Sequence, residues 1–154
     1  MAIFQIRYGD DAALRKTCKA VVVVNDRIRR ILDDMMDTLH STKNGAALAA
    51  NQVGILWRLV VIDYLGQQLK LVNPEIVEQS GTQECVEGCL SFPDRVAKTI
   101  RPQMVTVRAL DENGNPVSYT VEDEMAKCFC HELDHLDGIV FLDHAVEELS
   151  PEEL

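Results

Sequence analysis

The sequence is poor in aromatic side chains, in basic residues and in long apolar runs. Aromatic residues make up 5% of the 154 residues, and a single Trp is present. Acidic residues outnumber basic residues by 25 to 15, and the formal net charge of −10 disfavours binding to nucleic-acid phosphates or to an anionic membrane surface. Every apolar run is shorter than the roughly 20 residues that a membrane-spanning helix needs. We therefore expect no direct nucleic-acid binding and no membrane partner.

Signals for secretion and for several domains are also missing. Residues 1–7 lack the charged and apolar regions of a signal peptide, so we expect a cytoplasmic protein. The five cysteines are an odd number, which favours reduced thiols, with one available as a metal ligand, over a disulfide framework. No repeat or low-complexity linker divides the chain. We expect one domain over residues 1–154, with a short acidic C-terminal tail from about residue 145 that is mobile over residues 147–154.

The spacing of apolar residues predicts two helices and several strands. Apolar side chains recur every three or four residues over 28–39, which indicates a core-facing helix capped by Asn25 or Asp26. A second helix is expected between the acidic residues 122–124 and Gly138, which is typical of a helix end. Shorter apolar or alternating segments predict strands at residues 59–62, 68–72, 75–79, 104–110, 117–121 and 139–142.

The second helix carries the pattern His-Glu-x-x-His at residues 131–135. Residues four apart lie on one face of a helix, so His131 and His135 can offer two imidazole nitrogens to one metal ion. Glu132 lies where its carboxylate can take a proton from a metal-bound water. A catalytic site of this kind usually has a third protein ligand, for which the cysteines are better candidates than the two remaining histidines. The alternative interpretation is a pair of helical histidines on a solvated face.

Three stretches together resemble the three motifs of the peptide deformylase family. They are residues 45–52 (Gly-Ala-Ala-Leu-Ala-Ala-Asn-Gln), 87–91 (Glu-Gly-Cys-Leu-Ser) and 131–136 (His-Glu-Leu-Asp-His-Leu), in the family's order and at about its spacing. The resemblance covers nearly the whole chain to about Leu142. It implies an α+β fold in which short antiparallel strands pack around a central metal-binding helix, and the predicted order of elements agrees.

The resemblance implies a metal-dependent hydrolase that removes the formyl group from the N-terminal formyl-methionine of nascent polypeptides and releases formate. It makes Cys89, His131 and His135 the ligands of one divalent metal ion. The family uses Fe²⁺ in cells, with Zn²⁺, Ni²⁺ or Co²⁺ as possible replacements, and a thiolate with two imidazoles suits such ions. The implied partners are N-formyl-methionyl peptides or nascent chains, met at the ribosome.

The resemblance also implies the catalytic groups. Glu132 would take the proton of the attacking water and pass a proton to the leaving amine. The side-chain amide of Gln52 and the backbone N–H of Leu90 would stabilise the oxyanion that develops on the formyl group.

Residues for the substrate follow from the same resemblance. The peptide backbone is expected against the small residues Gly45, Ala46 and Ala47. Glu87 is expected at this site too, paired with Arg101 so that it holds the cysteine loop. The alternative is that Glu87 and Arg101 form a surface ion pair of little energetic weight.

Helix geometry places Glu124, Lys127 and Cys128 on the same face as His131. In the family this face lines the pocket for the methionine side chain, and its residues are commonly apolar. Two of the three are charged here, so we expect a pocket that is more polar than usual. The alternative is an ion pair between Lys127 and Glu124 at the rim, with only the aliphatic stems in the pocket.

Three positions depart from the family motifs. Ala47 stands where a second glycine is usual, Asn51 where proline is usual, and Cys130 where glutamine is usual. None of them is a ligand, the base or the oxyanion amide. Two alternative functions are a zinc peptidase of the His-Glu-x-x-His type, which leaves the motif at 87–91 unexplained, and a non-catalytic metal-binding relative.

Overall fold

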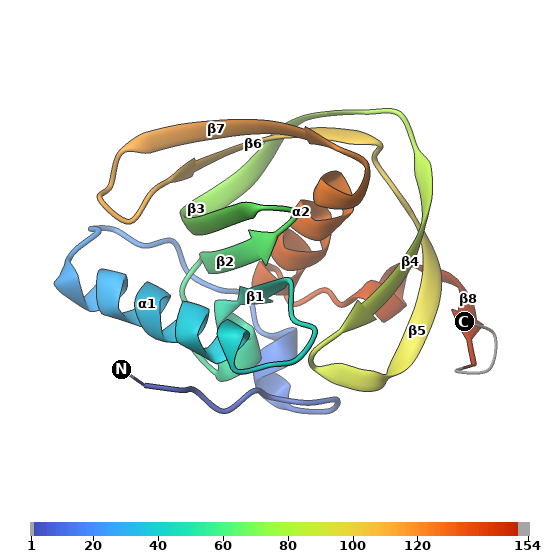
Figure 1. The fold of residues 1–154 in the computed structure, drawn as a ribbon, viewed down its shortest axis with the longest axis horizontal. Helices are drawn as coiled ribbons and strands as arrows, with labels where there is room; N and C mark the ends of the chain where they lie inside the picture. The colour runs from blue at the N-terminus through green and yellow to red at the C-terminus, as the bar shows by residue number, and fades with distance from the viewer. Residues whose placement is uncertain (1, 151–154) are drawn as a thin grey trace.

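The structure, a computed structural model, describes residues 2–150, and Figure 1 shows their arrangement. The elements in chain order are η1 (Ala12–Arg15), α1 (Asp26–His40), β1 (Ala47–Ala49), η2 (Ala50–Val53), β2 (Leu59–Tyr64), β3 (Gln67–Ser80), β4 (Gln83–Cys89), β5 (Phe92–Arg101), β6 (Met104–Leu110), β7 (Pro116–Glu122), α2 (Asp123–Leu136), η3 (Phe141–His144) and β8 (Ala145–Leu149), where η marks a 3₁₀ helix. Within this part of the chain, neither α-helix is long and apolar enough to cross a membrane.

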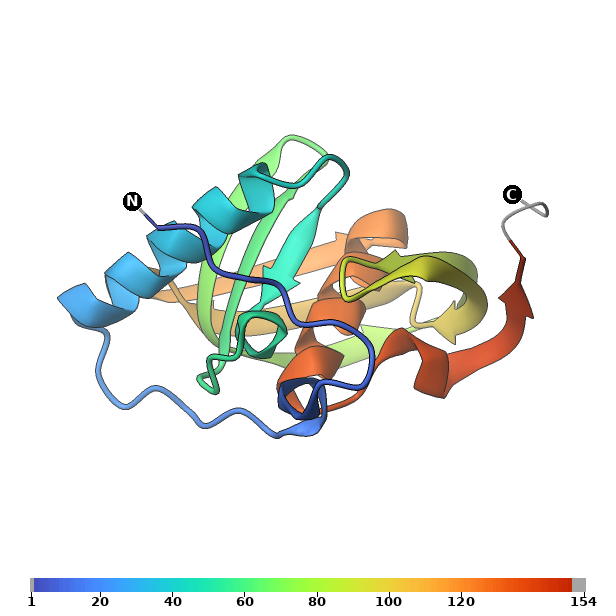
Figure 2. The same ribbon diagram turned by 90° about the horizontal axis from the view of Figure 1, so that it is seen from below.

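The strands form two antiparallel sheets. Five strands join in the order β1-β2-β3-β6-β7, and three join in the order β4-β5-β8. Every pairing between neighbouring strands is antiparallel. Figure 2 shows that α2 passes between the two sheets and that α1 covers the other face of the larger one. The prediction of an α+β fold, with antiparallel strands around the metal-binding helix, is confirmed.

Strand β2 is buried on both faces because a helix packs on each. Successive side chains of a strand point to opposite faces. Val60 and Ile62 therefore join the cluster around α2, whereas Leu59 and Val61 join the cluster around α1. Burying apolar surface on both faces stabilises the sheet by about 1.5–3 kcal/mol for each large side chain. This packing fixes the two helices relative to one another.

The helix α1 forms as its apolar spacing predicts. Asn25 caps its N-terminus, because its side-chain oxygen accepts a hydrogen bond from the backbone N–H of Ile28 (3.1 Å). The apolar stripe faces the larger sheet and consists of Ile28, Leu32, Met35, Met36 and Leu39. The methionines therefore have a packing role.

The helix α2 is buried along most of its length. It spans Asp123–Leu136, and Gly138 follows with a positive φ of 74° that glycine adopts without strain. Both histidines of the motif are buried. The alternative interpretation, two histidines on a solvated face, is therefore wrong.

The first departure from the predicted strands is β3, which runs unbroken through Asn73 and Pro74. A shift in register after Val72 accommodates Pro74, which has no N–H to donate to the ladder. Asn73 has a positive φ of 52°, and its side chain bonds the backbone N–H and carbonyl of Val21 at 2.8 and 2.9 Å. Two predicted strands are therefore one long bulged strand.

The C-terminal part also differs from the prediction. Residues 139–142 do not form a strand, because η3 begins at Phe141 and its Asp143 accepts a hydrogen bond from the Val140 N–H (3.0 Å). The acidic tail begins with a strand, β8 (Ala145–Leu149), so the expected mobility is wrong for residues 147–149. Its acidic side chains meet cations of β5, including Arg95, which lies 2.7 Å from Glu148. Residues 151–154 of the predicted tail lie outside the described residues.

Candidate active site

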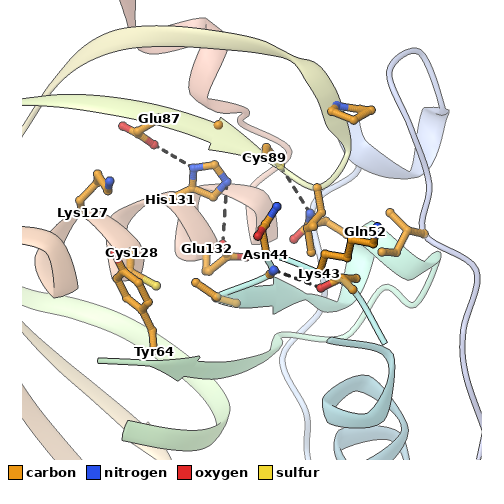
Figure 3. Close-up of a pocket in the computed structure, with 18 of the residues that line it drawn as sticks. Lys43, Asn44, Gln52, Tyr64, Glu87, Cys89, Lys127, Cys128, His131 and Glu132 are labelled. Carbon is orange, nitrogen blue, oxygen red and sulfur yellow. Dashed lines mark hydrogen bonds and ion pairs between the residues drawn. The ribbon is translucent and has the colours of Figure 1, made fainter. Parts of the chain in front are cut away.

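The predicted site residues converge on a cavity of about 740 Å³ between the edge strands β1 and β4, beside α2 (Figure 3). Among the predicted residues, those that line it are Gly45, Ala46, Ala47, Gln52, Glu87, Cys89, Leu90, Lys127, Cys128, His131 and Glu132. His135 lies beneath the cavity, fully buried next to Cys89. Glu124 does not line it. The fold therefore unites three motifs that are far apart in the sequence.

Three side chains at the base of the cavity could hold a metal ion. Cys89, His131 and His135 each offer one donor atom, and these atoms all lie within 4.8 Å of one another. The Cys89 Sγ and the His135 Nε2 are 3.4 Å apart. Donor atoms about 2.0–2.3 Å from a tetrahedral ion lie roughly 3.5 Å from each other. The donor set and its spacing therefore fit one divalent transition-metal ion.

A buried carboxylate fixes the orientation of His131. The Nδ1–H of His131 donates to Glu87 Oε1 (2.8 Å), which leaves Nε2 for a metal. Arg101 donates to the same carboxylate through Nε (2.7 Å) and Nη2 (3.0 Å), and Thr99 donates through its hydroxyl. The Nη1 of Arg101 reaches Asp134 at 2.6 Å. The predicted pair of Glu87 and Arg101 exists, and it is buried rather than on the surface.

These contacts set the charges at the base of the cavity. Burial alone would raise the pKa of Glu87, but the hydrogen bonds from His131 and Arg101 hold that pKa well below its ordinary value. Burial would lower the pKa of His131, yet its contacts with Cys89 and Glu87 raise that pKa well above normal. Burial and the nearby His131 lower the pKa of His135 well below normal. His131 therefore favours its charged form in this site, whereas His135 favours the neutral form, in which an imidazole nitrogen can bind a metal.

Glu132 is buried between the histidines and has the character of a proton acceptor. Burial raises the pKa of Glu132 to about 7, against the opposing effect of the nearby His131. A general base acts best when its pKa lies near the working pH. Among residues 2–150, the Oε1 atom of Glu132 has no hydrogen-bond partner, although it is buried. A buried and unpaired carboxylate oxygen that faces the cavity fits a site that is completed by water.

The amide of Gln52 is held from both ends. Its Oε1 accepts a hydrogen bond from the backbone N–H of Ala49 (2.9 Å), which turns the NH₂ group toward the metal ligands. The Nε2 atom donates to Ser91 Oγ (3.1 Å) and lies 3.5 Å from Cys89 Sγ. Leu90 directly follows Cys89 and lines the same cavity. Gln52 and Leu90 therefore line the same cavity beside Cys89.

The small residues 45–47 line another part of the cavity wall. A Cβ on Gly45 would meet the hydroxyl of Thr42 and would lie 2.7 Å from Leu39 Cδ1, so a larger residue would require these two side chains to move. Ala47 begins β1, whose other side pairs with β2. Ala47, one of the departures from the family motif, is buried, and its methyl group packs in the core around α2.

The other two departures are buried as well. Asn51 donates through Nδ2 to the backbone carbonyl of His135, so it links η2 to the metal-binding helix. Cys130 is packed in the core around α2, where burial raises its pKa to about 11. The five cysteines are free thiols, and all except Cys89 are buried. The four cysteines other than Cys89 therefore pack as small buried residues.

Sequence reasoning missed several residues of the site. Tyr64 lines the cavity because β2 ends there, and no local pattern connects it to residues sixty positions later. Ser91 accepts a hydrogen bond from the Gln52 amide, and Thr99 donates one to the Glu87 carboxylate. Thr99 could have been found from the sequence, because it lies two positions before Arg101 in β5 and its side chain therefore points to the same face.

An α+β fold with a Cys-His-His donor set next to a buried carboxylate defines a metal-dependent hydrolase. A family model described as Polypeptide deformylase matches residues 3–150. The chain belongs to the polypeptide deformylase family. It is therefore a metal-dependent enzyme that removes the formyl group from the N-terminal formyl-methionine of nascent polypeptides and releases formate. The zinc peptidase and the non-catalytic relative are not retained as alternatives.

Individual relatives agree over nearly the full length. Peptide deformylase 2 of Clostridium acetobutylicum is 58% identical over 147 residues, which are 96% of this chain and 98% of that protein. Among solved structures, a peptide deformylase from Legionella pneumophila gives a TM-score of 0.89 at 41% identity, covering 99% of this chain and 89% of that one. The structure of a Synechococcus elongatus peptide deformylase in complex with actinonin gives a TM-score of 0.88 at 38% identity, covering 92% of this chain and 78% of that one.

Proposed function

We propose that Glu132, Gln52 and the backbone of Leu90 carry out the deformylation, with Cys89, His131 and His135 as the only protein ligands of the metal. The observation that supports this proposal most directly is the convergence of these residues, from three distant motifs, on one cavity. A divalent ion held by such ligands makes water acidic enough to supply hydroxide near neutral pH. Fe²⁺ is the metal that we propose in cells, with Zn²⁺, Ni²⁺ or Co²⁺ able to replace it.

The proton transfers belong to Glu132. Its carboxylate takes a proton from the attacking water, whose oxygen forms a bond to the formyl carbon. The same carboxyl group then passes that proton to the leaving nitrogen as the C–N bond breaks, which gives a free amine and formic acid, and the acid loses its remaining proton to become formate. Burial suits this role, because it raises the pKa of Glu132 to about 7 and the proton is therefore held and released easily near neutral pH.

The oxyanion is stabilised by donors that are in place before the substrate arrives. The Gln52 amide is anchored by the Ala49 N–H, so its own N–H can face the formyl oxygen without reorganisation. The N–H of Leu90 is the second donor. A preorganised donor of this kind is typically worth about 3–4 kcal/mol of transition-state stabilisation.

The peptide binds in an extended conformation between two sheet edges. β1 is the outer strand of the larger sheet and β4 is the outer strand of the smaller one, and both border the cavity. An extended peptide can pair with such an edge through its backbone, whatever its sequence. Gly45 and Ala46 precede β1 and Ala47 begins it, and the small size of these residues lets the peptide approach. Cys128 and Lys127 border the pocket for the first side chain.

Glu87 acts on the substrate through His131 rather than by contact. Its carboxylate already accepts hydrogen bonds from His131, Arg101 and Thr99, so we propose that it orients the metal ligand. We further propose that the chain works as a single domain in the cytoplasm, where it meets nascent chains at the ribosome.

The test is anaerobic formate release from a formyl-methionyl peptide by metal-loaded protein, because both Fe²⁺ and Cys89 are easily oxidised. Glu132→Gln should keep its metal and lose at least about 100-fold in turnover. Cys89→Ala should lose most of its metal, whereas the control Cys18→Ala should keep it. Near-normal turnover of Glu132→Gln, or full metal content in Cys89→Ala, would contradict these assignments.

A further inference from the structure

One wall of the cavity carries a cation where the first side chain of the peptide would lie. Tyr64, Lys127 and Cys128 line this wall, and Figure 3 shows them on the opposite side of Glu132 from Gln52. The thiol of Cys128 stays protonated, because burial raises its pKa far above the ordinary value. Lys127 is therefore the charged donor on this wall.

The contacts of Lys127 account for two of its three protons. Its Nζ donates to Glu124 Oε2 (2.7 Å) and to the backbone carbonyl of Val86 (3.2 Å). Glu124 is also held by the Tyr64 hydroxyl, which donates to the same oxygen at 3.1 Å. An ammonium group has three N–H donors. Within residues 2–150 the Nζ has no third acceptor, so one donor remains on a side chain that lines the cavity and is 19% exposed.

The Glu124 contact also sets the net charge of the wall. Because its carboxylate neutralises Lys127, a negatively charged ligand would gain little from the ammonium and would meet the charge of Glu124 as well. A neutral acceptor faces no such opposition. A hydrogen bond in which the donor is charged is roughly twice as strong as one between neutral groups.

We propose that Lys127 makes the first-residue pocket accept side chains that end in a neutral hydrogen-bond acceptor, in addition to methionine. The chemical class is a sulfoxide or a carboxamide, as in methionine sulfoxide or glutamine. Methionine sulfoxide has the skeleton of methionine with one added oxygen, and it arises when a chain is oxidised. The pocket would thus allow deformylation of chains whose first methionine has been oxidised. This inference rests on the proposed function, because it assumes that a formyl peptide binds at this site.

The experiment measures binding separately from chemistry. Formyl tripeptides that differ only in their first residue, namely methionine, methionine sulfoxide, glutamine or glutamate, are titrated into metal-loaded Glu132→Gln protein and their Kd values are compared. The sulfoxide peptide should bind within about threefold of the methionine peptide, and the glutamate peptide should bind more weakly than the glutamine peptide. Adding Lys127→Met should weaken sulfoxide and glutamine binding by about tenfold relative to methionine binding in the same variant.

Lys70→Met is the matched control. Lys70 also lies 2.7 Å from a carboxylate, that of Asp33, and is 25% exposed, but it does not line the cavity. It should leave all four Kd values unchanged. Unchanged sulfoxide and glutamine binding in Lys127→Met, or a glutamate peptide that binds better than glutamine, would overturn the inference. Failure of the unmodified protein to release formate would instead overturn the proposed function, and these Kd values would still decide the chemistry of the pocket.

Discussion

Replacing Arg101 should reveal how much of the stability lies beneath the metal site. Arg101→Met removes the cation that donates twice to Glu87 and once to Asp134, and the side chains of Arg101 and Glu87 are only 5% and 1% exposed. Breaking a buried ion pair by removing one partner typically costs about 3–5 kcal/mol, because the remaining charge is left in a poorly solvated place. That loss is a large part of the 5–15 kcal/mol typical of a folded domain.

The same strand provides a matched control. Arg95 of β5 also donates two hydrogen bonds to a carboxylate, that of Glu148, at 2.7 and 3.0 Å. The side chains of Arg95 and Glu148 are, however, 50% and 46% exposed. Exposed ion pairs contribute about 0–1 kcal/mol. Arg95→Met should therefore cost at most about 1 kcal/mol.

The assay is equilibrium urea unfolding of chelator-treated proteins, so that differences in metal binding do not enter the comparison. Adding Glu87→Gln to Arg101→Met should recover part of the loss, because the buried carboxylate is then neutral. If Arg101→Met and Arg95→Met differ by less than 1 kcal/mol, the reasoning about burial is refuted.

Two further predictions concern residues outside the cavity. Burial raises the pKa of Cys18 from 9.0 to about 11, so the unfolded chain loses the thiol proton at a lower pH than the folded chain does. The free energy of unfolding should therefore fall by up to about 3 kcal/mol as the pH rises from 9 to about 11. Urea unfolding compared at about pH 8.5 and about pH 10.5 measures this decrease, which should be smaller in Cys18→Ala. Gly138→Ala should destabilise the folded protein by about 1–3 kcal/mol more than Gly66→Ala. Both glycines have positive φ, but only a Cβ at position 138 would lie 2.6 Å from a backbone oxygen, that of Arg15. Equal melting temperatures of the two variants would contradict this.

The helices and the metal-binding motif could be predicted from the sequence because their signals are local. His131 and His135 are about one helical turn apart, which places them on one face. Glu124 and Lys127 are three residues apart, which lets their side chains pair on the helix surface. Similarly, the apolar stripe of α1 indicates which side faces the core. The ion pair between Lys127 and Glu124 that the alternative interpretation included exists, and Lys127 also lines the cavity.

The strands β4 and β5 were harder to predict because their buried side chains are polar. Glu87, Thr99 and Arg101 point inward, so the strands lack the alternation of apolar and polar residues that indicates a half-buried strand. Charged residues can be buried only when partners from other elements meet them. Those partners come from elsewhere in the fold, as with His131 and Asp134, and no local pattern specifies them.

The placement of the open sheet edges has a consequence for solubility. An unpaired strand edge can template pairing with another chain, which is a route to aggregation. Here β8 pairs with the far side of β5 and carries Glu147 and Glu148, while β1, the edge beside the cavity, is only three residues long. The short edge β1 of the larger sheet thus offers few backbone groups to a misfolded strand, and β8, an outer strand of the smaller sheet, presents acidic side chains instead of an apolar edge.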